Sequence, residues 1–241
     1  MLIYGIVLYL TSASWIVNAT EFLPFSPKKN IFFLLLFLVV IAVVQGLIMS
    51  FPFIFYSNIE KNNITDVFSF SALYILGEFL QEYIPYVSFP WIRLCAVIAE
   101  KELLIQTSSL FGGLFVSFII IITNGLLCII IENIITKRAF GLPFALVSAI
   151  TILNIGFGII NVKTTEYIPD KTVLLVQGNF SGEEKRTSDE NEITEKYLNL
   201  SSSNLSSDVE LVIFPETAMP FSFSEHNYGT RRLSEFSKEN N

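Results

Sequence analysis

The sequence has few residues of the kinds that ligate metals or form disulfides. Among 241 residues there are two cysteines, Cys95 and Cys128, and one histidine. Both cysteines lie in or beside apolar segments, so the sequence indicates no disulfide framework and no zinc site, and we predict no metal and no cofactor. Lys and Arg are also scarce, 15 against 22 Asp and Glu. Because nucleic-acid binding needs clustered cations to neutralise phosphates, this balance argues against a nucleic-acid partner.

Long hydrophobic runs, in contrast, are abundant. Hydrophobic residues make up 52% of the chain, and 23 residues are Phe. A membrane-spanning helix needs roughly 20 mostly apolar residues. Five segments fit this pattern in varying degree, at residues 2 to about 17, 31–55, 67–87, 110–131 and 139–160. The sequence therefore predicts an all-α membrane bundle of about five spans over residues 1–161.

The character of the chain changes after residue 161. Residues 1–161 hold 7 Lys and Arg against 8 Asp and Glu, whereas the remainder holds 8 against 14. We interpret residues 162–171 as a linker and residues 172–241 as the start of an α/β domain. The β-branched run at 172–176 and the run at 209–214 are typical of buried strands.

A helix is expected between these two strands. Thr187 and Glu190 fit a capping box, and Ile193 and Tyr197 lie at helical spacing, before a polar loop at 201–207. Strand, helix and strand in this order imply a parallel βαβ unit. One such unit cannot bury both faces of its sheet, so we expect the domain to be incomplete in this chain.

One carboxylate follows the second strand directly. Glu216 stands in Pro-Glu-Thr-Ala at residues 215–218, and parallel α/β folds present reacting groups at the carboxyl ends of their strands. A carboxylate partly removed from water there has the character of a general base. The alternative is a solvated loop glutamate.

Polar residues in the third apolar segment are the candidate substrate-binding groups. Glu78, Gln81 and Glu82 share one helix face, and ionisable groups in a span usually face a protein interior or a wet cavity. For Glu78, contact with a lipid substrate and a place at the helix end remain open, whereas Glu82 fits the helix end. Trp91, close to Arg93, is either a headgroup contact or an interfacial anchor.

Several motifs resemble one family. Residues 176–179, Val-Gln-Gly-Asn, and 211–218, ending Phe-Pro-Glu-Thr-Ala, resemble the two opening strands of the nitrilase domain in apolipoprotein N-acyltransferases. Residues 72–80 and 88–91, the latter Ser-Phe-Pro-Trp, are similar to the membrane motifs of that family, and residues 2–16 look like its third span. The resemblance implies a membrane domain followed by a nitrilase-like αββα sandwich.

The resemblance also implies an activity. Such enzymes pass an acyl chain from a phospholipid, through a cysteine thioester, to the amine of a diacylglyceryl-cysteine at the N-terminus of an apolipoprotein. They use a Glu-Lys-Cys triad, in which Glu216 corresponds to the glutamate. The implied place is the bacterial inner membrane, as a multi-pass protein with its soluble domain on the periplasmic side.

Departures from the family pattern limit this expectation. No cysteine follows Cys128, and no lysine after Glu216 stands in a family motif. Gln81 and Ser88 replace an Arg and a Gly of the membrane motifs. We therefore expect a fragment, truncated at both ends and inactive as it stands.

Two other functions fit parts of the sequence. A non-enzymatic, transporter-like membrane protein with an acidic tail would leave Glu216 without a role and would need a polar path through the spans. A nitrilase-type amidase for soluble substrates is disfavoured because the α/β unit is joined to membrane spans.

Overall fold

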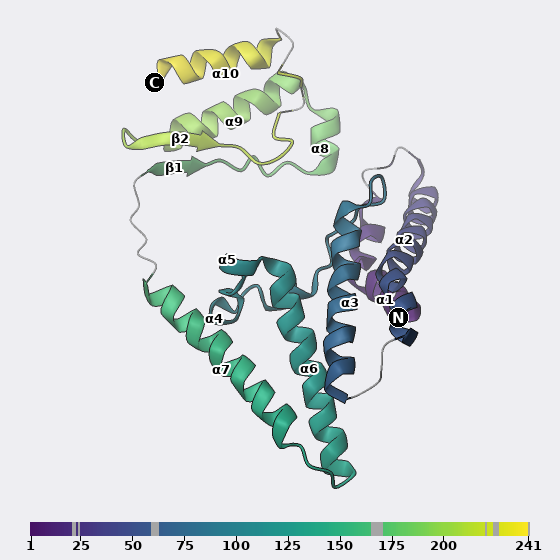
Figure 1. Ribbon diagram of the computed structural model, residues 1–241. Coiled ribbons are helices and arrows are strands. Elements are labelled where there is room, and N and C mark those ends of the chain that lie inside the picture. Colours follow the sequence, from purple (N-terminus) through teal and green to yellow (C-terminus); the bar gives the residue numbers. More distant parts are fainter. Residues whose placement is uncertain are drawn as a thin grey trace. The chain divides into compact units, whose positions relative to one another are not determined.

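The computed structural model describes residues 1–20, 23, 25–58, 63–164, 171–219, 221–223 and 227–240. The predicted linker at 162–171 lies mostly outside these residues. The chain divides into two compact units, Met1–Glu166 and Tyr167–Asn241. The first unit is helical, and the second combines two strands with helices (Figure 1).

The helical unit contains both long helices and short helical segments. In chain order its described elements are α1 (Leu2–Ser12), η1 (Ser14–Asn18), α2 (Pro27–Ser50), η3 (Phe51–Asn58), α3 (Asn63–Tyr83), η4 (Leu94–Ile98), α4 (Glu102–Ile105), α5 (Ser108–Phe111), α6 (Gly113–Ile135) and α7 (Gly141–Thr164). α1 packs along α2, and α6 packs against both α3 and α7. The core of this unit therefore lies along α6 and between α1, α2 and α3.

Three helices within the described part of the chain are long and apolar enough to cross a membrane. They are Pro27–Tyr56, which joins α2 to η3, and the helices α6 and α7. The predicted first span folds as an apolar helix, Leu2–Asn18, which is shorter than these three helices. α3 has 21 residues but carries Asp66, Glu78 and Glu82, and it is not among the three. Three of the five predicted spans are supported, and the count of five stays a prediction.

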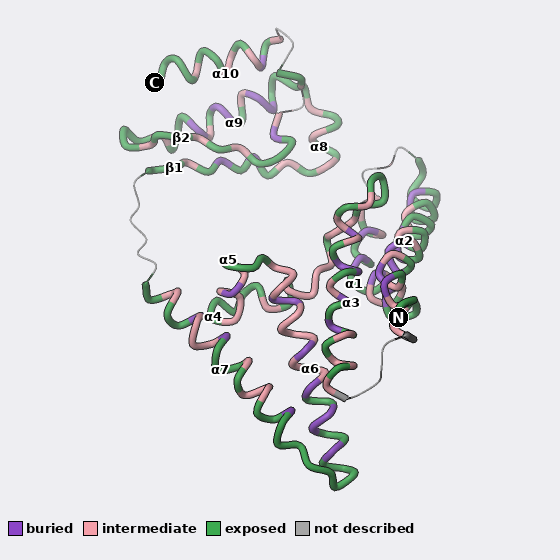
Figure 2. Tube along the Cα trace, in the orientation of Figure 1, coloured by how far each residue is buried: buried purple, intermediate pink, exposed green. Residues whose placement is uncertain are grey.

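The surface of the helical unit is apolar, as a lipid-facing surface must be. Figure 2 shows α7 as exposed or partly exposed along nearly all of its length, with buried residues concentrated along α6 and the facing helices. Ile152 and Leu153 on α7 are 69% and 72% exposed. Many other large apolar side chains are exposed on this unit as well. Such a surface indicates contact with lipid rather than with water.

The fourth predicted span begins later than expected. Residues 110 and 111 belong to α5, and Gly112, at φ 77°, interrupts the helix before α6 begins at Gly113. Glycine adopts this left-handed conformation without a steric penalty, whereas a side chain there is strained. The short helices η4, α4 and α5 therefore form a separate segment ahead of the span.

A buried amide, Asn154, holds this short-helix segment on α7. The Thr107 hydroxyl donates to Asn154 Oδ1 (3.1 Å), and Asn154 Nδ2 donates to Leu104 O (3.1 Å). Asn154 is 8% exposed. The carbonyls of a four-residue helix lack partners within the helix, and Asn154 supplies one to Leu104 O.

The second unit is the predicted parallel βαβ unit with additional helices. Its elements are β1 (Thr172–Leu175), α8 (Gly182–Thr187), α9 (Glu190–Asn204), β2 (Val209–Ile213) and α10 (Tyr228–Glu239). β1 and β2 pair in parallel, with Leu175 opposite Ile213. The expectation of a parallel βαβ unit is confirmed, and the full αββα sandwich stays a prediction.

One face of the small sheet is covered and carries the core of this unit. Ile193 and Tyr197 from α9 pack on Val176 and Ala218, with Leu174 and Val212 beside them. On the opposite face, Val173 and Leu211 stand across from each other and are 40% and 53% exposed. A parallel sheet is normally covered on both faces, so the second face has an apolar surface of the kind that packs against another layer.

Two local predictions in this unit were wrong. Thr187 does not cap α9: it ends α8, where its hydroxyl donates to Glu183 O (3.0 Å), and Asp189 is the N-cap of α9. The capping box lies instead between Ser181 and Glu184, at the start of α8. The predicted loop at 201–207 is helical to Asn204, because the Ser-rich turn still buries Ser201 against the core side of α9.

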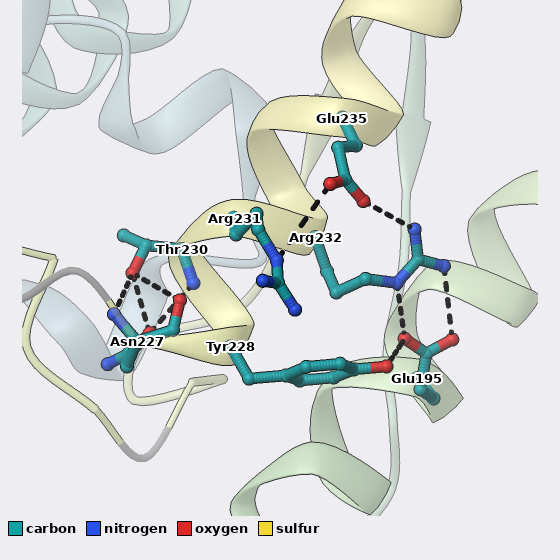
Figure 3. Close-up of polar contacts among 7 residues, drawn as sticks. All are labelled: Glu195, Asn227, Tyr228, Thr230, Arg231, Arg232 and Glu235. Atoms are coloured by element: carbon teal, nitrogen blue, oxygen red, sulfur yellow. Dashed lines mark hydrogen bonds and ion pairs between the residues drawn. The ribbon is translucent and has the colours of Figure 1, made fainter.

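An ion pair joins α10 to α9 (Figure 3). Arg232 Nε donates to Glu195 Oε1 at 2.8 Å, and the Tyr228 hydroxyl donates to the same oxygen at 2.8 Å. Arg232 also donates to Glu235 within α10 (3.2 Å). Glu195 on α9 thus accepts the ion pair and the hydrogen bond that hold α10 against α9.

This ion pair predicts a pH dependence. Hydrogen bonds from Arg232 first, and from Tyr228 second, hold the pKa of the Glu195 carboxyl below its ordinary value of 4.5. A carboxyl with a lowered folded-state pKa stabilises the fold above its ordinary pKa and loses that effect as pH falls through the lowered value. We therefore expect acidification below about pH 4.5 to lower the urea midpoint of the α/β unit.

The check is a urea titration followed by circular dichroism at several pH values, with the helical unit held in detergent. Glu195→Gln should make the acid dependence shallower, because the amide does not titrate. An unchanged pH profile in this variant would show that other carboxyls dominate the acid dependence.

Candidate functional site

Glu216 lies in a turn at the carboxyl end of β2. The turn is fixed by its neighbours, because Ala218 N–H donates to Pro215 O (3.2 Å) and Ala218 is buried in the core of the α/β unit. Thr217 has a φ of 56°, and its carbonyl accepts a hydrogen bond from Lys185 Nζ (3.1 Å). The Glu216 side chain is exposed. Its predicted catalytic role stays a prediction.

The end of β1 lies beside the same turn. Val176 N–H donates to Ile213 O (2.9 Å), so the Gln-Gly-Asn stretch after β1 runs next to the stretch that leads to Glu216. Gly178 is in close contact with Tyr197, since a Cβ at position 178 would lie 2.6 Å from the ring. Only glycine fits there, which explains in steric terms why this motif contains one. The two motifs thus lie side by side at the carboxyl end of the sheet.

No cysteine accompanies Glu216 in this unit. The two cysteines, Cys95 and Cys128, both belong to the helical unit. Among the described residues, no group of three or more His, Cys, Asp or Glu side chains is arranged to hold a metal ion. At the carboxyl end of the sheet, Glu216 supplies an accessible carboxylate on a fixed turn. This carboxylate can accept a proton from a group that lies close to it.

Glu78 occupies a different position, inside the helical unit. It is 2% exposed, and its Oε1 accepts the backbone N–H of Leu94 at 2.8 Å. Gln81, one turn further along α3, is also 2% exposed. Glu82, on the same side of the helix, is only half-buried and forms an ion pair with Arg93. The shared face therefore divides into a buried part and a part at the helix end.

Trp91 lies at the surface, in the segment that follows α3. It is 65% exposed, and its ring stacks on Trp15 with centroids 5.7 Å apart and planes 8° apart. Phe89 also stacks on Trp91, with ring centroids 4.8 Å apart and planes 29° apart. Aromatic rings of this kind are favoured where one side is apolar and the other wet, at membrane interfaces.

Sequence reasoning did not select two residues of this region. Trp15 lies within the apolar run at 2–16, and nothing local indicated that it meets Trp91, 76 positions away by residue number. Gln45 is fully buried in α2 and donates to Val87 O at 2.5 Å. The signal for Gln45 was available, because a lone amide in a long apolar helix is costly unless it has a partner.

The comparisons with known proteins address the helical unit. The family model for the N-terminal domain of apolipoprotein N-acyltransferase matches residues 1–126, from α1 into α6. This match includes Trp15, Glu78 and Trp91 but not Glu216. No curated protein matches the chain in a direct comparison. Because the matched region is more than half of the chain, this protein belongs to the apolipoprotein N-acyltransferase family.

Proposed function

We propose that the protein takes part in phospholipid-dependent N-acylation of apolipoproteins at the bacterial inner membrane. The observation that carries this proposal is the family match over residues 1–126. The membrane helices give it a second support, because an enzyme that takes its acyl chain from a phospholipid must work at the bilayer. The soluble unit is proposed to lie on the periplasmic side.

The proposed reaction has two steps. In the first, a cysteine thiol gives its proton to a carboxylate, and its sulfur attacks an ester carbonyl of the phospholipid, so that a thioester forms and a lysophospholipid leaves with a proton. In the second, the α-amine of the diacylglyceryl-cysteine attacks the thioester, forms an amide and releases the thiol. An activated thiol of this kind needs a base close by and a cation at the carbonyl oxygen.

Glu216 is the proposed base. Its support is the position at the carboxyl end of a parallel strand, on a turn that Ala218 and Lys185 hold. The α/β unit contains no cysteine, so the thiol of the proposed reaction does not come from this unit.

Trp91 is the proposed contact with the lipid substrate in the helical unit. Its exposed, stacked ring is the kind of surface that meets lipid headgroups and glycerol. Glu78 was a candidate for the same role, and its carboxylate accepts the Leu94 N–H in the interior. A lipid in contact with both Trp91 and Glu78 would have to enter the interior of the helical unit.

The test of the function is complementation of a bacterium with a conditional defect in lipoprotein N-acylation. The gene that carries these 241 residues, in its complete reading frame, is expected to restore growth and to yield triacylated lipoprotein by mass spectrometry. A gene product cut after residue 164 keeps the membrane helices and serves as the matched control, which should not restore growth. Failure of the complete frame, in a strain where the protein is present in the membrane, would overturn the proposed function.

A further inference from the structure

The segment between α3 and η4, residues 84–93, contains no helix or strand, yet hydrogen bonds hold it along its length. Phe89 is held from both sides: its N–H donates to Gln81 O (3.3 Å), and its carbonyl accepts from the Tyr9 hydroxyl (3.2 Å). The Ser88 hydroxyl donates to Glu82 O (2.9 Å). This segment carries Trp91, so its backbone determines where the exposed ring stands.

Two glutamines connect the segment to the interior of the bundle. Gln81 Nε2 donates to the backbone carbonyl of Gln45 (3.3 Å), and Gln45 Nε2 donates to Val87 O (2.5 Å). These side chains are 2% and 0% exposed. The path runs from α3 to α2 and from α2 to the segment, and we call it the amide bridge.

Glu78 holds the other end of the segment. Its carboxylate accepts the N–H of Leu94, the first residue of η4, while Arg93 forms its ion pair with Glu82. The segment is thus attached to the bundle before Trp91, through the amide bridge, and after Trp91, through Glu78. An amide or a carboxylate inside a membrane bundle is costly, and an apolar residue of similar size would pack without that cost.

We propose that Gln45, Gln81 and Glu78 are positioning residues that hold Trp91 stacked on Trp15. Trp15 comes from η1, so the stack forms only when the segment after α3 is fixed against the helices that precede it. Both rings are more than half exposed, so they bury little apolar area with which to fix a segment that has no helix or strand. The buried polar groups supply the rigidity that the exposed rings lack.

This inference rests on the proposed function in one respect: the ring that is positioned, Trp91, is the proposed lipid contact. It changes the role of Glu78, which acts on the lipid through Leu94 and Trp91 and does not touch it. It also gives the buried glutamines of α2 and α3 a role that neither charge nor motif indicated.

The chain contains two tryptophans, Trp15 and Trp91, so fluorotryptophan labelling yields one fluorine resonance for each. In the full 241-residue chain in phosphatidylcholine nanodiscs, Trp91→Leu gives the resonance of Trp15 without its stacking partner. Gln45→Met and Glu78→Met are expected to move the Trp15 resonance to that position, because each removes one attachment. Glu78→Gln keeps an acceptor for Leu94 N–H and is expected to retain the wild-type resonances.

Asn154→Leu is the matched control, since it removes a buried amide that holds α4 and α5 rather than the Trp91 segment. It should lower the thermal midpoint and leave both resonances in place. Wild-type resonances in both Met variants would overturn the proposal. An equal shift in Asn154→Leu would overturn it as well, because the signal would then report general loosening.

A spin-labelled phosphatidylcholine headgroup separates this inference from the proposed function. Broadening of the Trp91 resonance supports the lipid contact. If Trp91 is not broadened while the Met variants shift the Trp15 resonance, the proposed lipid contact fails and the positioning role stands.

Discussion

Glu216→Gln is expected to lower N-acylation by about two to four orders of magnitude, the usual contribution of a positioned general base. The substitution keeps the size of the side chain and its exposed place on the turn, and it removes the ability to accept a proton. Since the turn is held by Ala218 and by the Lys185 contact with Thr217, the fold should not depend on the carboxylate. The measurement is the rate at which the complete protein transfers an acyl chain to a lipoprotein acceptor in vesicles.

Glu210→Gln is the matched control for this experiment. Glu210 is an exposed carboxylate on β2, and it pairs with Lys171 across the sheet. Loss of an exposed pair changes stability little. The activity of this variant should therefore stay close to that of the wild type. Equal activity in Glu216→Gln and the wild type would remove Glu216 from the mechanism and leave the family membership intact.

Tyr197→Ala is expected to unfold the α/β unit while leaving the helical unit folded. Tyr197 is 1% exposed, and its ring meets Phe180 and Phe214 at centroid distances of 5.8 and 5.4 Å. Truncation of a buried aromatic to Ala costs about 3–5 kcal/mol. Small units have a small free energy of unfolding. A loss of that size therefore exceeds the stability expected for this unit.

Hydrogen–deuterium exchange resolved by peptide is the measurement. Peptides from α9 and β2 should exchange as fast as unfolded chain, whereas peptides from α6 should stay protected. Tyr197→Phe keeps the ring and serves as the control, with a cost below about 1.5 kcal/mol. Protection of α9 in the Ala variant would mean that the core identified around Ile193 and Tyr197 does not carry the stability of this unit.

The sequence alone was sufficient for the parts of this protein that depend on local pattern. The runs that became α2, α6 and α7 were recognisable because helices crossing lipid must satisfy their own backbone and carry apolar side chains all round. The parallel pairing of β1 and β2 followed from strand, helix and strand in succession. The helix starts were less accessible: Thr187, Ser181 and Asp189 all have side chains that cap helices, and their packing decides which of them does.

The arrangement at residues 84–93 was decided only by the tertiary structure. In the described part of the chain, α2, η3 and α3 lie between Trp15 and Trp91. Their stacking depends on Gln45, Gln81 and Glu78 finding partners across α2 and α3. Hydropathy marks each of these polar residues as unusual in an apolar segment, but it does not say which backbone group each one meets. A hydrogen bond between distant elements is satisfied only once both are folded. The sequence by itself thus determined the membrane character and the family, and tertiary packing decided which polar residues act together.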